Sequence, residues 1–137
     1  MNNTVLNAGT QLLGRVLISV IFIMAGINKI GAGYAGTQGY MESMGVPGML
    51  LPVVIILEIA GGLMVLAGWQ TRIAAFLLAG FTLVSAIIFH ANFADQMQSI
   101  MFMKNLSISG GLMILAAMGA GAVSRDNKLH GGRLANA

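Results

Sequence analysis

The sequence predicts an all-α integral membrane protein, a four-helix bundle with both termini in the cytoplasm. Of its 137 residues, 57% are hydrophobic and only 8% are charged, whereas a soluble domain carries about 25% charged residues. So few charges cannot cover a water-facing surface, so lipid is the expected outer solvent. Four apolar runs are each long enough to cross a bilayer, which takes about 20 residues. The length suits a single domain over residues 1–137.

The four predicted helices occupy residues 12–30, 49–67, 73–91 and 105–123, and a short cytoplasmic tail follows at 124–137. Three glycines within 31–36 end the first helix, and Pro47 opens the second. The segment 68–72 is so short that the second and third helices must form an antiparallel hairpin. Residues 92–103 are expected to form the loop before the fourth helix.

The distribution of Lys and Arg predicts the orientation in the membrane. One side of the predicted bundle holds five of these residues, namely Arg15, Arg72, Arg125, Lys128 and Arg133. The other side holds only Lys29 and Lys104. Because cytoplasmic segments carry the excess of positive charge in membrane proteins, both termini are predicted to be cytoplasmic.

Several function classes are disfavoured by composition. The net charge of +3 comes from scattered basic residues, a pattern that argues against nucleic-acid binding. The chain has no cysteine and two histidines, so disulfides and thiolate chemistry are excluded and no metal site is predicted. No phosphate-binding loop, nucleophile elbow or zinc-protease motif is present in the sequence. The first apolar stretch is too long, and too poor in preceding charge, for a signal peptide.

Glu58 is the most informative residue of the chain. It lies within the apolar run LLPVVIILEIAGGLMVL at residues 50–66. A charged residue at the bilayer centre costs about 2.5–3.5 kcal/mol even on lenient insertion scales. We therefore predict that Glu58 faces the bundle interior and pairs with a cation from the first helix, either Arg15 or Lys29. The alternative to a functional role is a purely structural ion pair.

The remaining polar residues predict a ligand pocket. Lys29, His90 and Lys104 lie at helix ends that share one level in an antiparallel bundle. Glu58 lies about 13 Å deeper, at about 1.5 Å per residue. We predict a pocket that opens toward the periplasm and is lined by these four residues, with Arg15 as a further candidate. In the alternative interpretation, the basic side chains extend to lipid phosphates.

Small residues beside the polar positions predict close contacts between helices. Gly26 shares a helical face with Lys29, and Gly61 and Gly62 follow Glu58 by three and four residues. Gly111 lies on the corresponding face of the fourth helix. Because glycine lets two backbones approach closely in a membrane, these four residues are predicted to pack helices together.

Six short motifs follow one another along the chain: Arg15 with FIMAGINKI at 22–30, GVP at 45–47, LEIAGGLMVLAGWQTRIAA at 57–75, His90, KNLSISGGLMIL at 104–115, and GAGAVSRD at 119–126. Their order and spacing resemble those of the DoxX family of small four-helix membrane proteins. Where the family commonly has a small or apolar residue before its Asp, this chain has Arg125. No special role is therefore expected for Asp126.

The resemblance implies a multi-pass protein of the bacterial inner membrane. The archetype of the family is a membrane subunit of a thiosulfate:quinone oxidoreductase, and other members look like membrane partners in redox-stress complexes. The expected function is therefore a membrane subunit in quinone-linked redox or oxidative-stress metabolism, with quinone as ligand and a redox protein as partner. Two alternatives stay open: a non-catalytic scaffold that recruits a partner protein, and a small-solute or proton transporter that would form a homo-oligomer. No catalytic residue is assigned.

Overall fold

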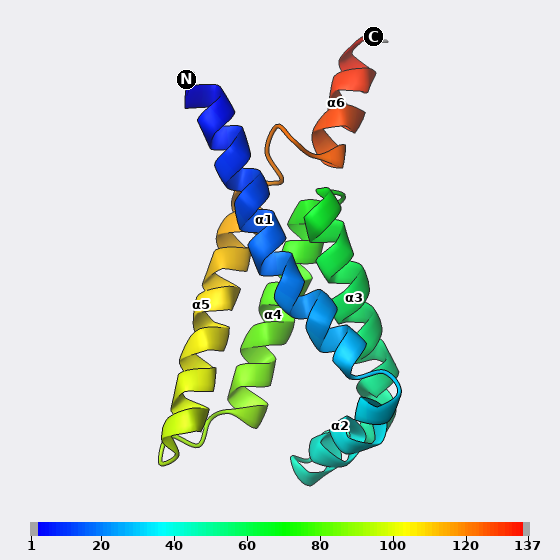
Figure 1. Cartoon of the computed structure of the whole chain (residues 1–137), viewed down its shortest axis with the longest axis vertical. Helices are drawn as coiled ribbons and strands as arrows, with labels where there is room; N and C mark the ends of the chain where they lie inside the picture. Colours follow the sequence, from blue (N-terminus) through cyan, green and yellow to red (C-terminus); the bar gives the residue numbers. More distant parts are fainter. Residues whose placement is uncertain (1–2, 136–137) are drawn as a thin grey trace.

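The computed structural model describes residues 3–135, and Figure 1 shows that this part consists of helices joined by short connections. The elements are α1 Asn3–Asn28, α2 Ala32–Ser43, the 3-10 turn η1 Gly48–Leu50, α3 Leu51–Ala67, α4 Thr71–Phe89, α5 Gln96–Met118 and α6 Arg125–Ala135. Four helices, α1, α3, α4 and α5, are long and apolar enough to cross a membrane. The predicted all-α membrane fold with four spans is therefore confirmed.

The spans pack as two pairs that α3 and α4 join. α1 lies against α3, α5 lies against α4, and α3 contacts α4. The buried core contains Phe22, Val65, Leu78 and Leu112. Because lipid is the outer solvent, most apolar side chains face outward and only this thin core is buried. In Figure 1, α1 diverges from α5 toward the end of the bundle that carries α2.

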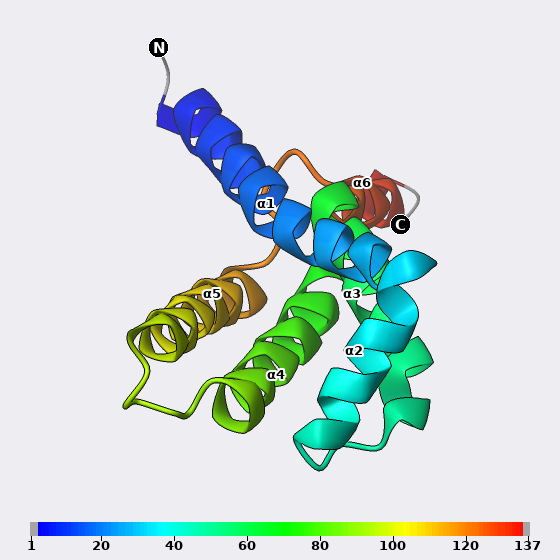
Figure 2. The same cartoon turned by 60° about the horizontal axis from the view of Figure 1, so that its bottom comes forward.

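The two ends of the bundle differ in what they carry (Figure 1). The N-terminus of α1 and the helix α6 lie at one end, which we call the tail end. The opposite end, which we call the cavity end, carries α2, and Figure 2 brings it forward. The tail end is predicted to face the cytoplasm from the distribution of Lys and Arg.

Three of the four spans begin or end close to their predicted positions. α3 begins two residues later than the predicted helix 49–67, and α4 is shifted by two residues from the predicted 73–91. α1 ends at Asn28 but begins at Asn3, well before the predicted start at residue 12. Its first turns are more polar than the apolar run, so hydropathy alone places the start of the helix too late.

The connection after α1 differs most from the prediction, because much of it is the helix α2. Gly31 has φ 66° and reverses the chain direction, as glycine permits. Gly33 and Gly36 lie inside α2 instead of interrupting the chain. Met41 is 5% exposed and anchors α2 to the bundle. Burial of this face outweighs the low helix propensity of the glycines.

α5 begins and ends earlier than the predicted helix 105–123, so this prediction is wrong in its bounds. The Asp95 carboxylate caps the helix by accepting hydrogen bonds from the backbone N–H groups of Met97 at 2.8 Å and Gln98 at 3.3 Å. Gly119, with φ 85°, ends the helix. The predicted loop 92–103 therefore contains the first two turns of α5.

The predicted tail is also structured, and the expectation that Asp126 has no special role is wrong. Its carboxylate accepts hydrogen bonds from the backbone N–H groups of Gln70 at 2.7 Å and Thr71 at 3.0 Å. Its own N–H donates to the carbonyl of Gly68 at 2.8 Å. Since the first N–H groups of a helix lack intrahelical partners, Asp126 caps α4 from a distant part of the chain.

The glycines predicted to pack helices divide into two groups. A Cβ on Gly62 would lie 2.8 Å from Cγ1 of Ile23, and one on Gly26 would lie 3.3 Å from Cβ of Glu58. Gly61 meets Leu78 at 3.1 Å in the same way. These three glycines allow α1 and α4 to approach α3 closely. A Cβ on Gly111 would lie 3.5 Å from Ile18, an ordinary contact, so no close approach requires glycine there.

Candidate functional site

An ion pair between α1 and α3 forms one wall of the candidate site. The Lys29 ammonium donates to Oε1 of Glu58 at 2.9 Å and to Oε2 at 2.8 Å. It also donates to the carbonyl of Ala25 at 3.1 Å. Lys29 follows the last turn of α1, and its side chain folds back along the helix to reach deeper into the bundle. The Glu58 side chain faces the interior and is 5% exposed, so Lys29 is the predicted partner that the structure selects.

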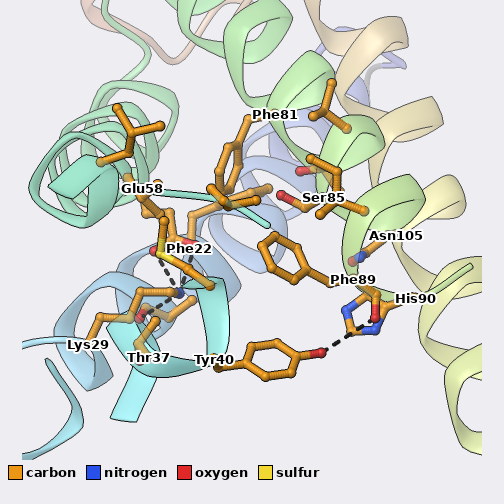
Figure 3. A pocket seen from close by; sticks show the side chains of 18 of the residues that line it. Phe22, Lys29, Thr37, Tyr40, Glu58, Phe81, Ser85, Phe89, His90 and Asn105 are labelled. Atoms are coloured by element: carbon orange, nitrogen blue, oxygen red, sulfur yellow. Dashed lines mark hydrogen bonds and ion pairs between the residues drawn. The ribbon is translucent and has the colours of Figure 1, made fainter. Parts of the chain in front are cut away.

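A cavity of about 540 Å³ lies beside this ion pair. All four spans and α2 contribute to its walls, which are mainly apolar. Aromatic side chains from three helices line it, namely Phe22, Tyr40, Phe81 and Phe89. Figure 3 shows Phe89 lying between the ion pair and the opposite wall. The volume falls within the range of about 300–1,000 Å³ that is typical of small-molecule sites.

The opposite wall carries the polar groups of His90 and Asn105 (Figure 3). Nδ1 of His90 lies 2.7 Å from Oε1 of Gln98. In the tautomer whose Nδ1 donates to that amide oxygen, Nε2 is left as an acceptor. The side chain of Asn105 makes no hydrogen bond to any residue from 3 to 135 that the structure describes, so it can serve a ligand.

α2 closes the outer side of the cavity. Thr37, Tyr40 and Met41 of this helix all line it. The Tyr40 ring packs on Phe89 with their centroids 5.5 Å apart, and the Tyr40 hydroxyl donates a weak hydrogen bond to the Phe89 carbonyl at 3.5 Å. Tyr40 is therefore a contact between α2 and α4 across the mouth of the cavity (Figure 3).

The predicted site residues do not all meet. Lys29, Glu58 and His90 line the same cavity, as predicted. Lys104 does not line it and is exposed on α5. The neighbouring Asn105 lines the cavity instead, because consecutive residues of a helix point in directions about 100° apart. The register of α5 about its own axis decides between the two, and hydropathy does not report it.

Arg15 lies at the tail end and does not line the cavity, so it is not the partner of Glu58. It is 2% exposed. Its Nη2 donates to the carbonyl of Val123 at 2.5 Å, and Asp126 attracts it electrostatically. Its carbonyl accepts a hydrogen bond from the hydroxyl of Ser19, also at 2.5 Å. These contacts make Arg15 a link between α1 and the segment that leads into α6.

Sequence reasoning missed Tyr40 and Asn105. Tyr40 lies in the segment predicted as a loop, and α2 is too short and too rich in glycine to resemble a span. Asn105 is the first residue of the predicted helix 105–123 and is not among the predicted pocket residues. The usable signal is that its amide lies within an apolar span, where an unpaired polar group is expensive. Among residues 3–135 no cluster of three or more His, Cys, Asp or Glu side chains could hold a metal ion.

Together, these groups make a site for a largely apolar molecule with polar atoms at its edges. The Lys29 ammonium has three donors, and all three have partners. A ligand on this wall would therefore have to share a Lys29 donor with Glu58 or Ala25, because no donor is left without a partner. On the other wall, Asn105 offers both donors and an acceptor, and His90 offers an acceptor.

Comparison with known proteins identifies the same family that the sequence motifs indicate. The DoxX family model matches residues 10–91. The inner membrane protein YqjF of Escherichia coli (strain K12) is 56% identical over 119 residues, which cover 87% of this chain and 91% of that protein. YphA, another inner membrane protein of the same strain, is 35% identical over 124 residues, covering 85% and 88% of the two chains.

A third relative is known from another bacterium. CatD of Bacillus subtilis (strain 168), which carries a provisional description as an oxidoreductase, is 40% identical over 80 residues, covering 58% of each chain. No solved structure gives a significant match. The relatives and the four spans identify the chain as an inner membrane protein. The chain therefore belongs to the DoxX family.

Proposed function

We propose that the chain is a membrane subunit in quinone-linked redox metabolism, and that its cavity binds the head group of a membrane quinone. The observation that carries the proposal is the composition of the cavity walls. An aromatic, mainly apolar space of about 540 Å³ has the Lys29–Glu58 pair on one wall and Asn105 on the other. The provisional description of CatD as an oxidoreductase supports the same direction.

The chemistry of these walls fits a quinone. Its flat ring has apolar faces and two carbonyl acceptors on opposite edges. Phe22, Phe81 and Phe89 offer aromatic contacts to a ring. The amide N–H of Asn105 and the ammonium of Lys29 lie on opposite walls, which suits acceptors on opposite edges. A bound quinone would supply the two-electron, two-proton chemistry that these side chains lack.

The residues of the chain would bind, orient and exclude water. Beside the apolar space, Lys29 holds exchangeable protons at Nζ, and the carboxylate oxygens of Glu58 can accept a proton. α2 covers the outer side, with the ring of Tyr40 on Phe89, and so limits access of water from that side. The chain has no cysteine, and we assign the delivery of electrons to a partner redox protein.

The test is binding of duroquinone, a quinone without a tail, to the purified protein in detergent. The variants are Lys29→Met and Glu58→Gln. Lys104→Met is the matched control, because it removes a lysine that lies outside the cavity. We expect each cavity variant to weaken binding about tenfold, as loss of one hydrogen bond to a charged group does. The control should bind like the wild type.

Other outcomes would favour the remaining functions. If the wild type binds no quinone, or all four proteins bind it equally, the proposal fails and a scaffold for a partner protein becomes the better interpretation. Solute uptake into proteoliposomes without quinone binding would favour a transporter. Mass spectrometry of the protein purified in mild detergent provides an independent check, because it detects a quinone that co-purifies.

A further inference from the structure

A second cavity, of about 840 Å³, lies along α5. Ile21 of α1 lines it from the other side, and the remaining lining residues belong to α5. Its apolar members on α5 are Ile100, Met101, Met103 and Ile108, and its polar members are Gln96, Ser99, Lys104, Asn105 and Ser107. We call this space the α5 groove. It lies toward the cavity end, where α1 and α5 diverge in Figure 1.

The α5 groove and the candidate quinone cavity share three lining residues, namely Ile21, Asn105 and Ile108. These residues come from α1 and α5, the two spans that diverge in this region. The shared residues therefore mark a junction through which the cavity communicates with the outer surface of the bundle. No other span contributes to the α5 groove, so this junction faces lipid and not another helix of the chain.

The packing of the spans explains why the bundle is open here. α1 packs on α3 and α5 packs on α4, so each outer span has its main partner on one side. α5 has the smallest buried share of the four spans, 11% of its most apolar window. Side chains of its groove face, including Ile100 and Met103, are therefore left in contact with lipid.

We infer that the α5 groove receives the polyprenyl tail of the quinone whose head group occupies the cavity. The inference rests on the proposed function. A head group inside the bundle requires an exit for its tail, and α2 covers the outer side of the cavity. The junction at Ile21 and Ile108 leads instead sideways into lipid, which dissolves the tail. The flexible, unbranched side chains of Met101 and Met103 suit a tail without fixed shape.

The inference assigns different ligand parts to different residues. The cavity residues recognise the head group, so they act on quinones with and without a tail. Ile100 lines only the α5 groove, so it contacts only the tail. Ile21 lies at the junction and limits the width of the exit. Leu17, one turn earlier on α1, lines neither space and is exposed to lipid.

The experiment compares two ligands in nanodiscs, duroquinone and a ubiquinone with a long polyprenyl tail. Ile100→Trp and Met103→Trp change residues that line only the groove, and Leu17→Trp is the control for adding a ring to a lipid-facing position. Both groove variants should weaken binding of the long-tailed quinone about tenfold, the loss expected when about two methylenes lose their contacts. Both should bind duroquinone like the wild type, and Leu17→Trp should bind both ligands normally.

The outcomes separate this inference from the proposed function. If duroquinone binds and neither groove variant changes the affinity for the long-tailed quinone, the groove assignment is overturned while the head-group cavity stands. Equal weakening of both ligands also overturns it, because the effect is then not specific to the tail. If the wild type binds neither quinone, the proposed function and the groove assignment fall together. Thermal unfolding of each variant identifies a misfolded one, and Ile100→Trp tests the groove if Met103→Trp does not fold.

Discussion

Helix α1 brings a cation to each end of the bundle, and the two ends use it differently. At the tail end, Arg15 is 2% exposed and donates to a backbone carbonyl, that of Val123. A Cβ on Gly68 would collide with its guanidinium, so the guanidinium packs tightly against the turn that follows α3. At the cavity end, Lys29 pairs with the carboxylate of Glu58 beside a space of about 540 Å³.

The tail end is bound together by contacts between side chains and backbone. Asp126 caps α4, and Arg72 donates to the last carbonyls of α5, those of Ala116, Ala117 and Met118. Backbone groups at helix ends have few other partners in a membrane. A charge bound in this way stabilises the fold. A charge bound to another side chain beside a cavity is available to a ligand.

The largest expected effect is a loss of stability when the charged contacts of the tail end are removed. The double variant Arg15→Met with Asp126→Asn removes the guanidinium and the carboxylate that bind backbone groups at the tail end. Loss of Arg15 leaves the carbonyl of Val123 without its donor. Loss of one Asp126 oxygen leaves one N–H group at the start of α4 without its acceptor. We expect the free energy of unfolding to fall by about 3 kcal/mol or more. Thermal unfolding in detergent, followed by circular dichroism, measures it. A stability equal to that of the wild type would contradict the structural role of this end.

A smaller effect is expected for Asp126→Asn alone. The carboxylate uses one oxygen for the N–H of Gln70 and the other for the N–H of Thr71. Asparagine offers only one acceptor oxygen, so one of the two bonds is lost together with the charge. The expected loss is about 1 kcal/mol. The same thermal assay checks it, with the exposed Lys128→Ala as a control in the same helix. An equal loss in the control would assign the effect to α6 in general and not to the cap.

The cavity end should respond less in stability and more in binding. The double variant Lys29→Met with Glu58→Gln removes both members of the ion pair. Replacing both partners of a buried pair is often nearly neutral, so the free energy of unfolding should stay within about 1 kcal/mol of the wild type. Binding of duroquinone should nevertheless weaken, as in the single variants. A loss of stability as large as that of the tail-end double variant would make the Lys29–Glu58 pair purely structural.

The last prediction concerns orientation and involves no expected change in stability. The chain has no cysteine, so a single introduced cysteine reports its position without interference. Asn92→Cys lies in the connection between α4 and α5 at the cavity end, and Lys128→Cys lies in α6. In intact cells, a membrane-impermeant maleimide should label residue 92 and not residue 128. The reverse pattern would place the cavity end in the cytoplasm.

Hydropathy and the cost of buried charge predict the parts of the molecule that the bilayer controls. They predict four spans, and they predict that Glu58 faces the interior with a cation from α1 as its partner. The antiparallel order of the helices also predicts that Lys29 and His90 lie at the same depth in the membrane. These features depend on how deep a residue lies in the membrane. That depth follows from the residue's place within an apolar run, which can be read from the sequence.

Features that depend on rotation about a helix axis, or on caps, could not be predicted. The choice between Lys104 and Asn105 requires the rotation of α5, which its contacts with α4 determine. The start of α5 depends on the carboxylate of Asp95, and the start of α4 depends on Asp126, more than 50 residues later. α2 escaped prediction because its helix is stabilised by burial of Met41 and not by intrinsic propensity.

The cap on α4 has a consequence for biosynthesis. Asp126 follows all four spans in the chain, so it leaves the ribosome only after the last of them. Until then, the N–H groups of Gln70 and Thr71 lack this acceptor. In the meantime, only lipid headgroups or water can accept their hydrogen bonds. The nascent chain can therefore insert all its spans while one end of the bundle is still unfinished. Synthesis of the final segment completes that end.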